Sequence, residues 1–263
     1  MDLGLNGKVA IVTGASDGIG YAAAWEMANE GADVIICART KGPLEDAAKK
    51  IETETGKSIL PIACDVTNLT DIDNLFKNVK EQFGSIHILV NNAGTSAAAP
   101  FDETSDETWD YDIDLKLYGA IRCSRLAIEQ MKKQSYGRII NITTPGGKAP
   151  SASSVPTSVS RAAGIALTKA MSKDFAKHNI LVNTVGVGLI RSGQHRKRWE
   201  IRTDSDPDLS LDDFYGEMSS AIPMGRVGDA NEVGAVIAFL ASERASYVTG
   251  ASINVDGGTS PVV

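Results

Sequence analysis

Seven short runs of apolar, mostly β-branched residues recur along the chain and alternate with longer stretches that follow the helical period. The runs cover residues 9–14, 33–38, 58–63, 87–92, 138–143, 180–185 and 251–256. Nearly continuous apolar runs are typical of strands that are buried on both faces of a parallel sheet. Since strands and helical stretches alternate, crossover helices are expected to join the strands. The pattern predicts an α/β fold, a doubly wound parallel sheet of about seven strands with helices on both faces.

The chain shows no internal boundary. No repeat, low-complexity tract or linker divides the 263 residues, and an α/β domain built on one parallel sheet commonly reaches this length. Residues 1–263 are therefore expected to form a single domain. The one irregular stretch, at about 190–220, holds HRKRWE, the acidic turn DSDPD and a helix-like LDDFYGEM. Such a long excursion from a compact domain is usually functional, and we interpret it as a substrate lid.

Composition narrows the class of protein. The net charge of −7 disfavours nucleic acid as a partner, and no apolar run approaches the length that crosses a membrane. The start lacks a basic segment followed by an apolar run, which favours a cytoplasmic protein. Cys37, Cys64 and Cys123 match no zinc or CxxC spacing, so we expect buried free thiols and no metal site.

The segment TGASDGIG at 13–20 carries the first chemical signal. It follows an apolar run and precedes a stretch with helical period. Gly14, Gly18 and Gly20 let the backbone turn tightly and approach a pyrophosphate, whose charge then meets the helix N-terminus. Taken alone, the same segment is compatible with a tight strand-to-helix turn that binds no ligand.

Further motifs occur in a fixed order after this turn. They are CDV at 64–66, NNAG at 91–94 and DGG at 256–258. In these motifs and their order the chain resembles the short-chain dehydrogenase/reductase family from end to end. The resemblance implies a Rossmann fold and a bound nicotinamide dinucleotide. The residues it assigns to this cofactor are Gly14, Ser16, Asp17, Gly18, Ile19, Gly20, Arg39, Asp65, Val66, Asn91, Ala93, Gly94, Arg161, Gly188, Ile190 and Ser192.

The choice of coenzyme depends on the end of the second predicted strand. NAD-preferring sites usually carry an acid there for the ribose 2′-hydroxyl, whereas this chain has Ala38 followed by Arg39. The Arg39 guanidinium can pair with a 2′-phosphate, which favours NADP(H) over NAD(H). Asp17 argues against this preference, because a carboxylate near the phosphate would repel it. An exposed Arg39 without a specific role is the alternative.

The family's catalytic residues are a tyrosine and a lysine in YxxxK, an earlier serine, and an asparagine on the preceding long helix. Alignment places Thr144 at the serine, Thr157 at the tyrosine, Arg161 at the lysine and Asp114 at the asparagine. An aliphatic hydroxyl is a far weaker acid than a phenol, and an arginine effectively never deprotonates. The sequence thus predicts an altered catalytic centre.

A buried carboxylate at Asp114 needs a partner, and an ion pair with Arg161 is our hypothesis for it. The alternative is that Asp114 faces a wet cavity and pairs with nothing.

Several functions remain open. An oxidoreductase acting on the CH–OH group or carbonyl of a small-molecule substrate is favoured, with Lys148, Tyr118, His195 or Tyr215 as substitute proton donors. A catalytically silent dinucleotide-binding subunit or sensor, or a non-redox lyase with Asp114 or His195 as base, are the alternatives. The resemblance also implies a homotetramer or homodimer, and the silent-subunit hypothesis a hetero-oligomer with an active relative.

Overall fold

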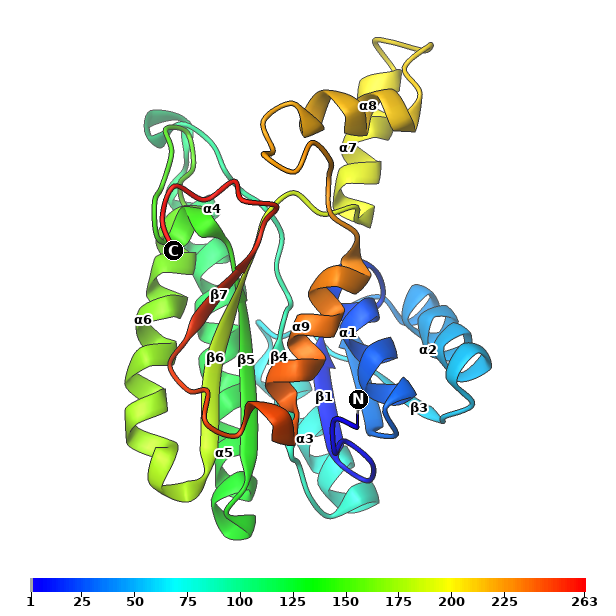
Figure 1. Cartoon of the computed structure of the whole chain (residues 1–263), viewed down its shortest axis with the longest axis vertical. Coiled ribbons are helices and arrows are strands. Elements are labelled where there is room, and N and C mark those ends of the chain that lie inside the picture. The colour runs from blue at the N-terminus through cyan, green and yellow to red at the C-terminus, as the bar shows by residue number, and fades with distance from the viewer. Residues whose placement is uncertain (1) are drawn as a thin grey trace.

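The computed structural model describes residues 2–263 and contains one parallel sheet of seven strands in the order β3-β2-β1-β4-β5-β6-β7 (Figure 1). The strands are β1 (Val9–Thr13), β2 (Asp33–Ala38), β3 (Ile59–Ala63), β4 (Ile88–Asn91), β5 (Gly137–Thr143), β6 (Ile180–Val187) and β7 (Ser252–Val255). All neighbouring strands pair in parallel. The doubly wound fold predicted from the apolar runs is confirmed.

Within residues 2–263, nine α-helices cover the sheet and form an excursion above it. They are α1 (Gly18–Asn29), α2 (Lys41–Thr55), α3 (Leu69–Phe83), α4 (Asp106–Ile113), α5 (Gly119–Gln134), α6 (Thr157–Phe175), α7 (Gly193–Thr203), α8 (Leu211–Ser219) and α9 (Ala230–Ala241). A π-helical turn, η2 (Asp114–Tyr118), links α4 to α5. None of the helices within residues 2–263 has both the length and the apolar character that a membrane span requires.

Each face of the sheet carries its own core. Along β1, Ala10 and Val12 pack with α1, α2 and α9, whereas Val9 and Ile11 pack with α3, α5 and α6. Successive strand side chains point to opposite faces, so a strand between two helix layers must be apolar at every position. All five residues of β1 are buried for this reason.

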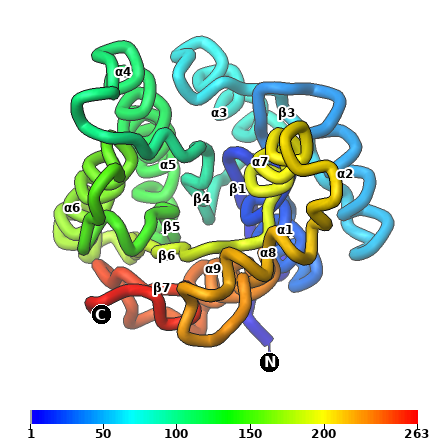
Figure 2. Tube along the Cα trace, turned by 90° about the horizontal axis from the view of Figure 1, so that it is seen from above, coloured from blue at the N-terminus to red at the C-terminus, as the bar shows by residue number. Residues whose placement is uncertain are grey.

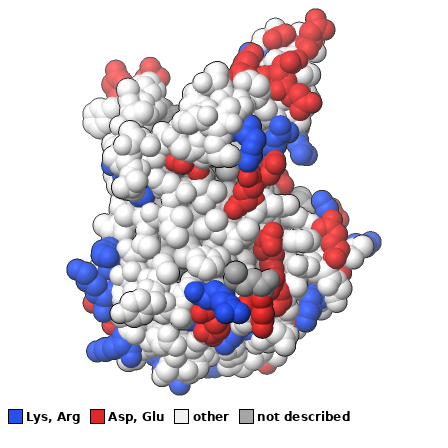
Figure 3. All heavy atoms as spheres, in the orientation of Figure 1, with Lys and Arg blue, Asp and Glu red and all other residues white. Residues whose placement is uncertain are grey.

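The predicted lid forms α7 and α8, which stand above the carboxyl edge of the sheet (Figures 1 and 2). The excursion has a small core of its own, made by Leu209, Phe214, Tyr215, Ile222 and Val227. The indole of Trp199 donates to the carbonyl of Leu209 at 2.9 Å. Figure 3 shows acidic side chains over the outer end of this excursion. The excursion is thus an ordered helical pair.

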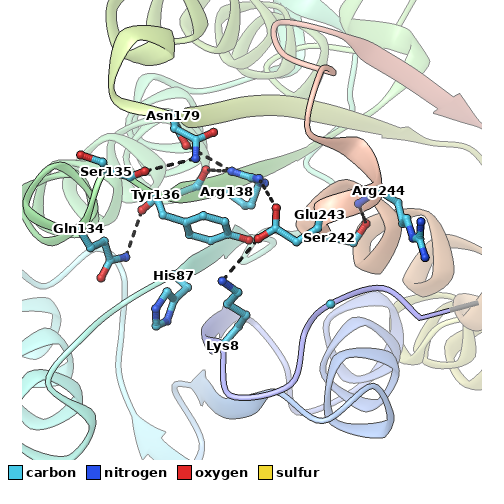
Figure 4. Close-up of polar contacts among 12 residues, drawn as sticks. Lys8, His87, Gln134, Ser135, Tyr136, Arg138, Asn179, Ser242, Glu243 and Arg244 are labelled. Carbon is cyan, nitrogen blue, oxygen red and sulfur yellow. Dashed lines mark hydrogen bonds and ion pairs between the residues drawn. The ribbon is translucent and has the colours of Figure 1, made fainter.

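Charged groups gather at the opposite end of the sheet, near the amino ends of β1 and β5 (Figure 4). Arg138 is 1% exposed, and its guanidinium lies 3.4 Å from the Glu243 carboxylate. Lys8 approaches the same carboxylate at 3.5 Å. Both cations also lie over the Tyr136 ring: the Lys8 ammonium group is 4.0 Å and the Arg138 guanidinium 4.3 Å from its centroid. One carboxylate therefore compensates two cations, of which one is fully buried.

The contact between α1 and α9 depends on Gly234. A Cβ at this position would lie 2.9 Å from the backbone carbon of Ala22. We therefore expect Gly234→Ala to lower the free energy of unfolding by about 1–3 kcal/mol through overpacking. Gly216→Ala in α8 is the control, because a Cβ there meets nothing within 4 Å. The control should be neutral or raise stability by up to about 1 kcal/mol. Equal urea midpoints for the two variants would contradict this packing argument.

Neutralising Glu243 should destabilise the fold, because Arg138 loses its counter-charge in a buried position. The Glu243 side chain is 47% exposed, so Glu243→Gln is expected to cost about 1–2 kcal/mol, less than the roughly 3–5 kcal/mol of a fully buried pair. Glu45→Gln removes an exposed pair with Lys41 and should change stability by less than about 0.5 kcal/mol. Chemical denaturation measures both, and a Glu243→Gln protein as stable as the wild type would refute the role of this carboxylate.

Candidate active site

The site begins where the strand order reverses between β1 and β4. Asn92, just after β4, donates from its side-chain amide to the carbonyls of Thr13 and Gly14, each at 2.9 Å. The backbone N–H groups of Asn92 and Ala93 donate to the Thr13 hydroxyl at 3.0 Å. In open α/β sheets ligands bind in the crevice at such a switch point. These bonds fix the walls of that crevice.

The glycine turn has the shape that a pyrophosphate requires. Gly14 has φ +65°, and a Cβ there would lie 2.8 Å from the Cα of Ala93. Gly18 has φ +60° and opens α1, whose first N–H groups face the crevice end of the turn. A left-handed backbone at both positions favours glycine, and a helix N-terminus attracts anions. The turn therefore fits a dinucleotide phosphate.

Asp17 caps this helix. Its carboxylate accepts from the Gly18 N–H at 2.7 Å. It also lies against the start of α7, where a side chain on Gly193 would collide with it. Asp17 therefore joins the phosphate turn to the base of the lid.

A cavity of about 360 Å³ extends from this turn across the ends of β1, β2 and β4. Of the residues assigned to the cofactor, those that line it are Gly14, Ser16, Asp17, Gly18, Ile19, Arg39, Asp65, Val66, Ala93, Gly94 and Ser192. One oxygen of Asp65 accepts from the backbone and hydroxyl of Thr67 at 2.9 Å and 2.8 Å. The second carboxylate oxygen is left to accept from an adenine amine.

Two of the residues assigned to the cofactor, Asn91 and Gly20, support the walls of the crevice. They line neither this cavity nor the second cavity beside it. Asn91 donates to Ser124 and Asn141 inside the sheet, at 3.1 Å and 2.8 Å. Gly20 lets α1 pack closely, since a Cβ there would lie 2.5 Å from the Asn92 side chain. Asn92 itself, which the sequence analysis did not assign, lines both cavities.

A second cavity of about 510 Å³ opens beside the first. The two share Ile19, Asn92, Gly94, Thr95, Ser192 and Gln194. Thr144, Thr157 and Arg161 all line the second cavity, as do Gly188 and Ile190. The lid contributes His195 and Arg198 to it. Three of the four residues predicted at the catalytic positions thus meet in one cavity that is continuous with the proposed nucleotide site.

Arg161 is held firmly in this wall. Its guanidinium donates to the carbonyl of Ile142 at 2.7 Å, and its Nε is buried without a hydrogen-bond partner. Burial lowers its pKa to about 10, against the opposing effect of the nearby Asp112 carboxylate. A Cβ on Gly94 would lie 2.7 Å from the Arg161 guanidinium, so a side chain there would displace the guanidinium from this position.

The hypothesis of an Asp114–Arg161 ion pair is wrong. Asp114 lies in η2 and pairs with Arg122 at 2.7 Å. Its side chain is 34% exposed, and it lines neither cavity. Asp114 therefore lies on the outer side of η2, away from both cavities.

Most of the other proposed proton donors lie away from the second cavity. Lys148 donates to Ser252 and Asn254 of β7 at 2.9 Å and 2.8 Å. Tyr118 is half exposed, and Tyr215 packs within the lid under Arg191. His195 lines the cavity, its Nδ1 is buried without a partner, and burial together with the charge of Arg198 lowers its pKa.

The structure adds a buried charged group that the sequence analysis missed. Lys116 in η2 forms an ion pair with Asp112, and the two side chains are each 1% exposed. The Lys116 Nζ also donates to the Thr157 hydroxyl at 3.0 Å. Ser160 donates to the other Asp112 oxygen at 2.6 Å. Thus Lys116, and not Asp114, is the residue of this segment that meets Thr157.

The helical spacing contained a signal for this arrangement. Asp112, Lys116, Gly119 and Cys123 follow one another at intervals of three or four residues, and all four are buried. An acid and a lysine four residues apart on the same face as a small residue and a cysteine indicate a buried pair, whereas Asp114 lies off that face.

Comparison with known proteins agrees with this architecture. The family model described as enoyl-(acyl carrier protein) reductase matches residues 14–260. The 3-oxoacyl-(acyl-carrier-protein) reductase of Thermotoga maritima is 35% identical over 254 residues, which cover 97% of this chain and 98% of that protein.

Solved structures of oxidoreductases are also similar to this chain over nearly their whole length. L-sorbose reductase from Gluconobacter frateurii, complexed with NADPH and L-sorbose, superposes over the whole of both chains with a TM-score of 0.95 and 32% identity. YwfH, described as an NADPH-dependent reductase involved in bacilysin biosynthesis, has a TM-score of 0.89 and 32% identity over 97% of this chain and 99% of its own. The chain belongs to the short-chain dehydrogenase/reductase family of oxidoreductases, whose members bind nicotinamide dinucleotides.

Proposed function

We propose that the protein is an NADP(H)-dependent oxidoreductase that interconverts the carbonyl and alcohol of a small, hydroxylated, anionic substrate. The observation that carries the proposal is the continuity of the two cavities: one has the glycine turn, and the other has Thr144, Thr157 and Arg161 in its wall. A bound nicotinamide supplies or accepts a hydride. The protein's own part is to orient the substrate, exclude water and move a proton.

Arg39 supports the preference for NADP(H). It follows β2 at the mouth of the nucleotide cavity and donates to the Tyr111 hydroxyl at 2.8 Å. Among residues 2–263 no carboxylate forms an ion pair with Arg39, whereas the Asp17 carboxylate accepts from the Gly18 N–H. An oriented guanidinium without a counter-ion suits a 2′-phosphate. The similar sorbose reductase and YwfH are both described with NADPH.

The lining of the second cavity, the larger of the two, supports a hydroxylated, anionic substrate. Its hydroxyl side chains are those of Thr95, Ser96, Thr144, Ser151, Ser154, Thr157, Ser158, Ser192 and Thr259. Arg161 and Arg198 line it too, and no Asp or Glu does so within the described part of the chain. A hydroxyl-rich wall suits a polyol, and two cations without an acid favour a substrate with a carboxylate or phosphate.

A dinucleotide-binding protein without turnover is the second candidate. It is favoured by Arg161, which is held by the carbonyl of Ile142 and stays charged at neutral pH. A screen of carbonyl and alcohol turnover with bound NADPH separates the two. We expect slow turnover, and none with any substrate would favour the second candidate.

Arg39→Met should weaken NADPH binding about 10-fold and leave NADH binding nearly unchanged, because only the 2′-phosphate loses a charged hydrogen bond. Fluorescence titration with both coenzymes measures the ratio. Arg125→Met, an exposed arginine on α5, serves as the control. Equal affinity of the wild type for the two coenzymes would remove the basis of the preference.

Arg198→Met should raise the KM for a ketogluconate about 10-fold and leave the KM for neutral L-sorbose unchanged, since only the anion loses its partner. Lys197→Met is the matched control, because Lys197 is exposed on the same helix and does not line the cavity. Initial rates with NADPH measure both. If the wild type turns over L-sorbose faster than the acid, and Arg198→Met changes neither, the proposed charge of the substrate is wrong.

A further inference from the structure

We propose that Lys116 is the proton source of the reaction and that the Thr157 hydroxyl carries its proton into the larger cavity. The inference rests on the proposed oxidoreductase function. It gives a role to the buried pair of Asp112 and Lys116, and it supplies an acid in a chain whose sequence offers no tyrosine at position 157.

The hydrogen bonds of Thr157 define the direction of its hydroxyl hydrogen. The oxygen accepts from the backbone N–H of Ala97 at 3.0 Å and from the Lys116 Nζ at 3.0 Å. A hydroxyl has two acceptor lone pairs and one hydrogen. Since both lone pairs are engaged, the hydrogen points in a third direction. Thr157 lines the larger cavity, so the hydroxyl can donate to a substrate there.

Lys116 reaches this cavity only through Thr157. Its side chain is 1% exposed, and it does not line the larger cavity. The hydrogen-bond partners of its Nζ are a carboxylate oxygen of Asp112 and the Thr157 hydroxyl. The ammonium group is therefore shielded from bulk water and connected to the cavity by one hydroxyl.

The charges around Lys116 make it an effective acid. Two charged groups face it, Asp112 from α4 and Arg161 from α6. The residues of β1, β4 and α5 beside it are uncharged: Thr13, Asn91, Gly119 and Ala120. Burial and the positive charge of Arg161 lower the pKa of Lys116 to about 8, although Asp112 opposes this shift. A proton donor is most effective when its pKa lies near the working pH.

Reduction of the substrate adds one hydride and one proton to its carbonyl group. In reduction the carbonyl carbon takes a hydride from the reduced nicotinamide, and the carbonyl oxygen takes the Thr157 hydroxyl proton, directly or through one water. The Thr157 oxygen takes a proton from Lys116, which becomes a neutral amine. After the product leaves, Lys116 regains its proton from water in the cavity through the same hydroxyl. Oxidation of the alcohol reverses each transfer.

The first test is the pH dependence of kcat/KM for ketogluconate reduction with saturating NADPH, because kcat/KM reports the pKa values of the enzyme before the substrate binds. Lys116 is active in its protonated form, so kcat/KM of the wild type should be constant below pH 7 and fall through a pKa near 8. Lys116→Met should lower kcat about 10²- to 10⁴-fold and abolish this pH limb. Lys133→Met, an exposed lysine of α5, should keep the wild-type profile.

Two further variants separate the relay from folding. Lys116→Met leaves the Asp112 carboxylate buried without a partner, so the double variant Asp112→Asn/Lys116→Met is made beside it, and circular dichroism checks both folds. Thr157→Val replaces the hydroxyl with a methyl group and should also abolish the fall in rate at high pH. Thr157→Ser restores a hydroxyl and should recover most of the activity.

A second test does not depend on turnover. NMR titration of the lysine ammonium groups, assigned through Lys116→Met, should find one lysine that titrates near pH 8 and shifts in Thr157→Val. A Lys116 that stays protonated beyond pH 10 would overturn the relay and leave the proposed function intact. So would a Thr157→Val enzyme with wild-type kcat and pH profile. A wild type that binds NADPH and turns over no carbonyl would overturn the proposed function and the relay together.

Discussion

The site depends on one constraint, the connection between the end of β1 and the loop after β4. The Asn92 amide donates to the carbonyls of Thr13 and Gly14, and the Thr13 hydroxyl accepts from two backbone N–H groups of the loop. These bonds satisfy backbone groups that the reversal of strand order leaves without a ladder partner. They also hold the two cavities side by side, because Asn92 lines both.

A second constraint is electrostatic. Asp112, Lys116 and Arg161 bring two positive charges and one negative charge to the wall between α4, η2 and α6. Buried charges are unfavourable unless they are paired and hydrogen-bonded. Asp112 meets this condition with bonds from Lys116 and Ser160. Arg161 meets it only in part, because it donates to the Ile142 carbonyl while its Nε is buried without a partner among the described residues. The net positive charge of these three side chains lies beside the second, larger cavity, which is lined by hydroxyl groups.

The sequence predicted the fold well and the catalytic region only in part. Apolar runs determine which segments lie between two helix layers, and these runs located all seven strands. The glycines of TGASDGIG and their place between a strand and a helix likewise predicted a tight turn there, and Gly14 and Gly18 have φ near +60° in the structure. The Asp114–Arg161 pair failed because single positions were compared along the chain without following the helical face. A π-helical turn then shifts the facing residue, and propensities do not reveal such a turn.

Thr157, at the position where the family resemblance predicts a tyrosine, has a physical consequence for the proposed reaction. A threonine hydroxyl is too weak an acid to act alone, so the proposed reaction needs another proton source, and Lys116 is the titratable donor that contacts this hydroxyl. The same Arg161 charge that lowers the pKa of Lys116 favours an anionic substrate in the cavity. An anion bound there would offset part of that charge and raise the pKa of Lys116. In the proposed reaction, the charge of the substrate and the supply of the proton are therefore coupled through Arg161, and Lys116 is most fully protonated when an anionic substrate is bound.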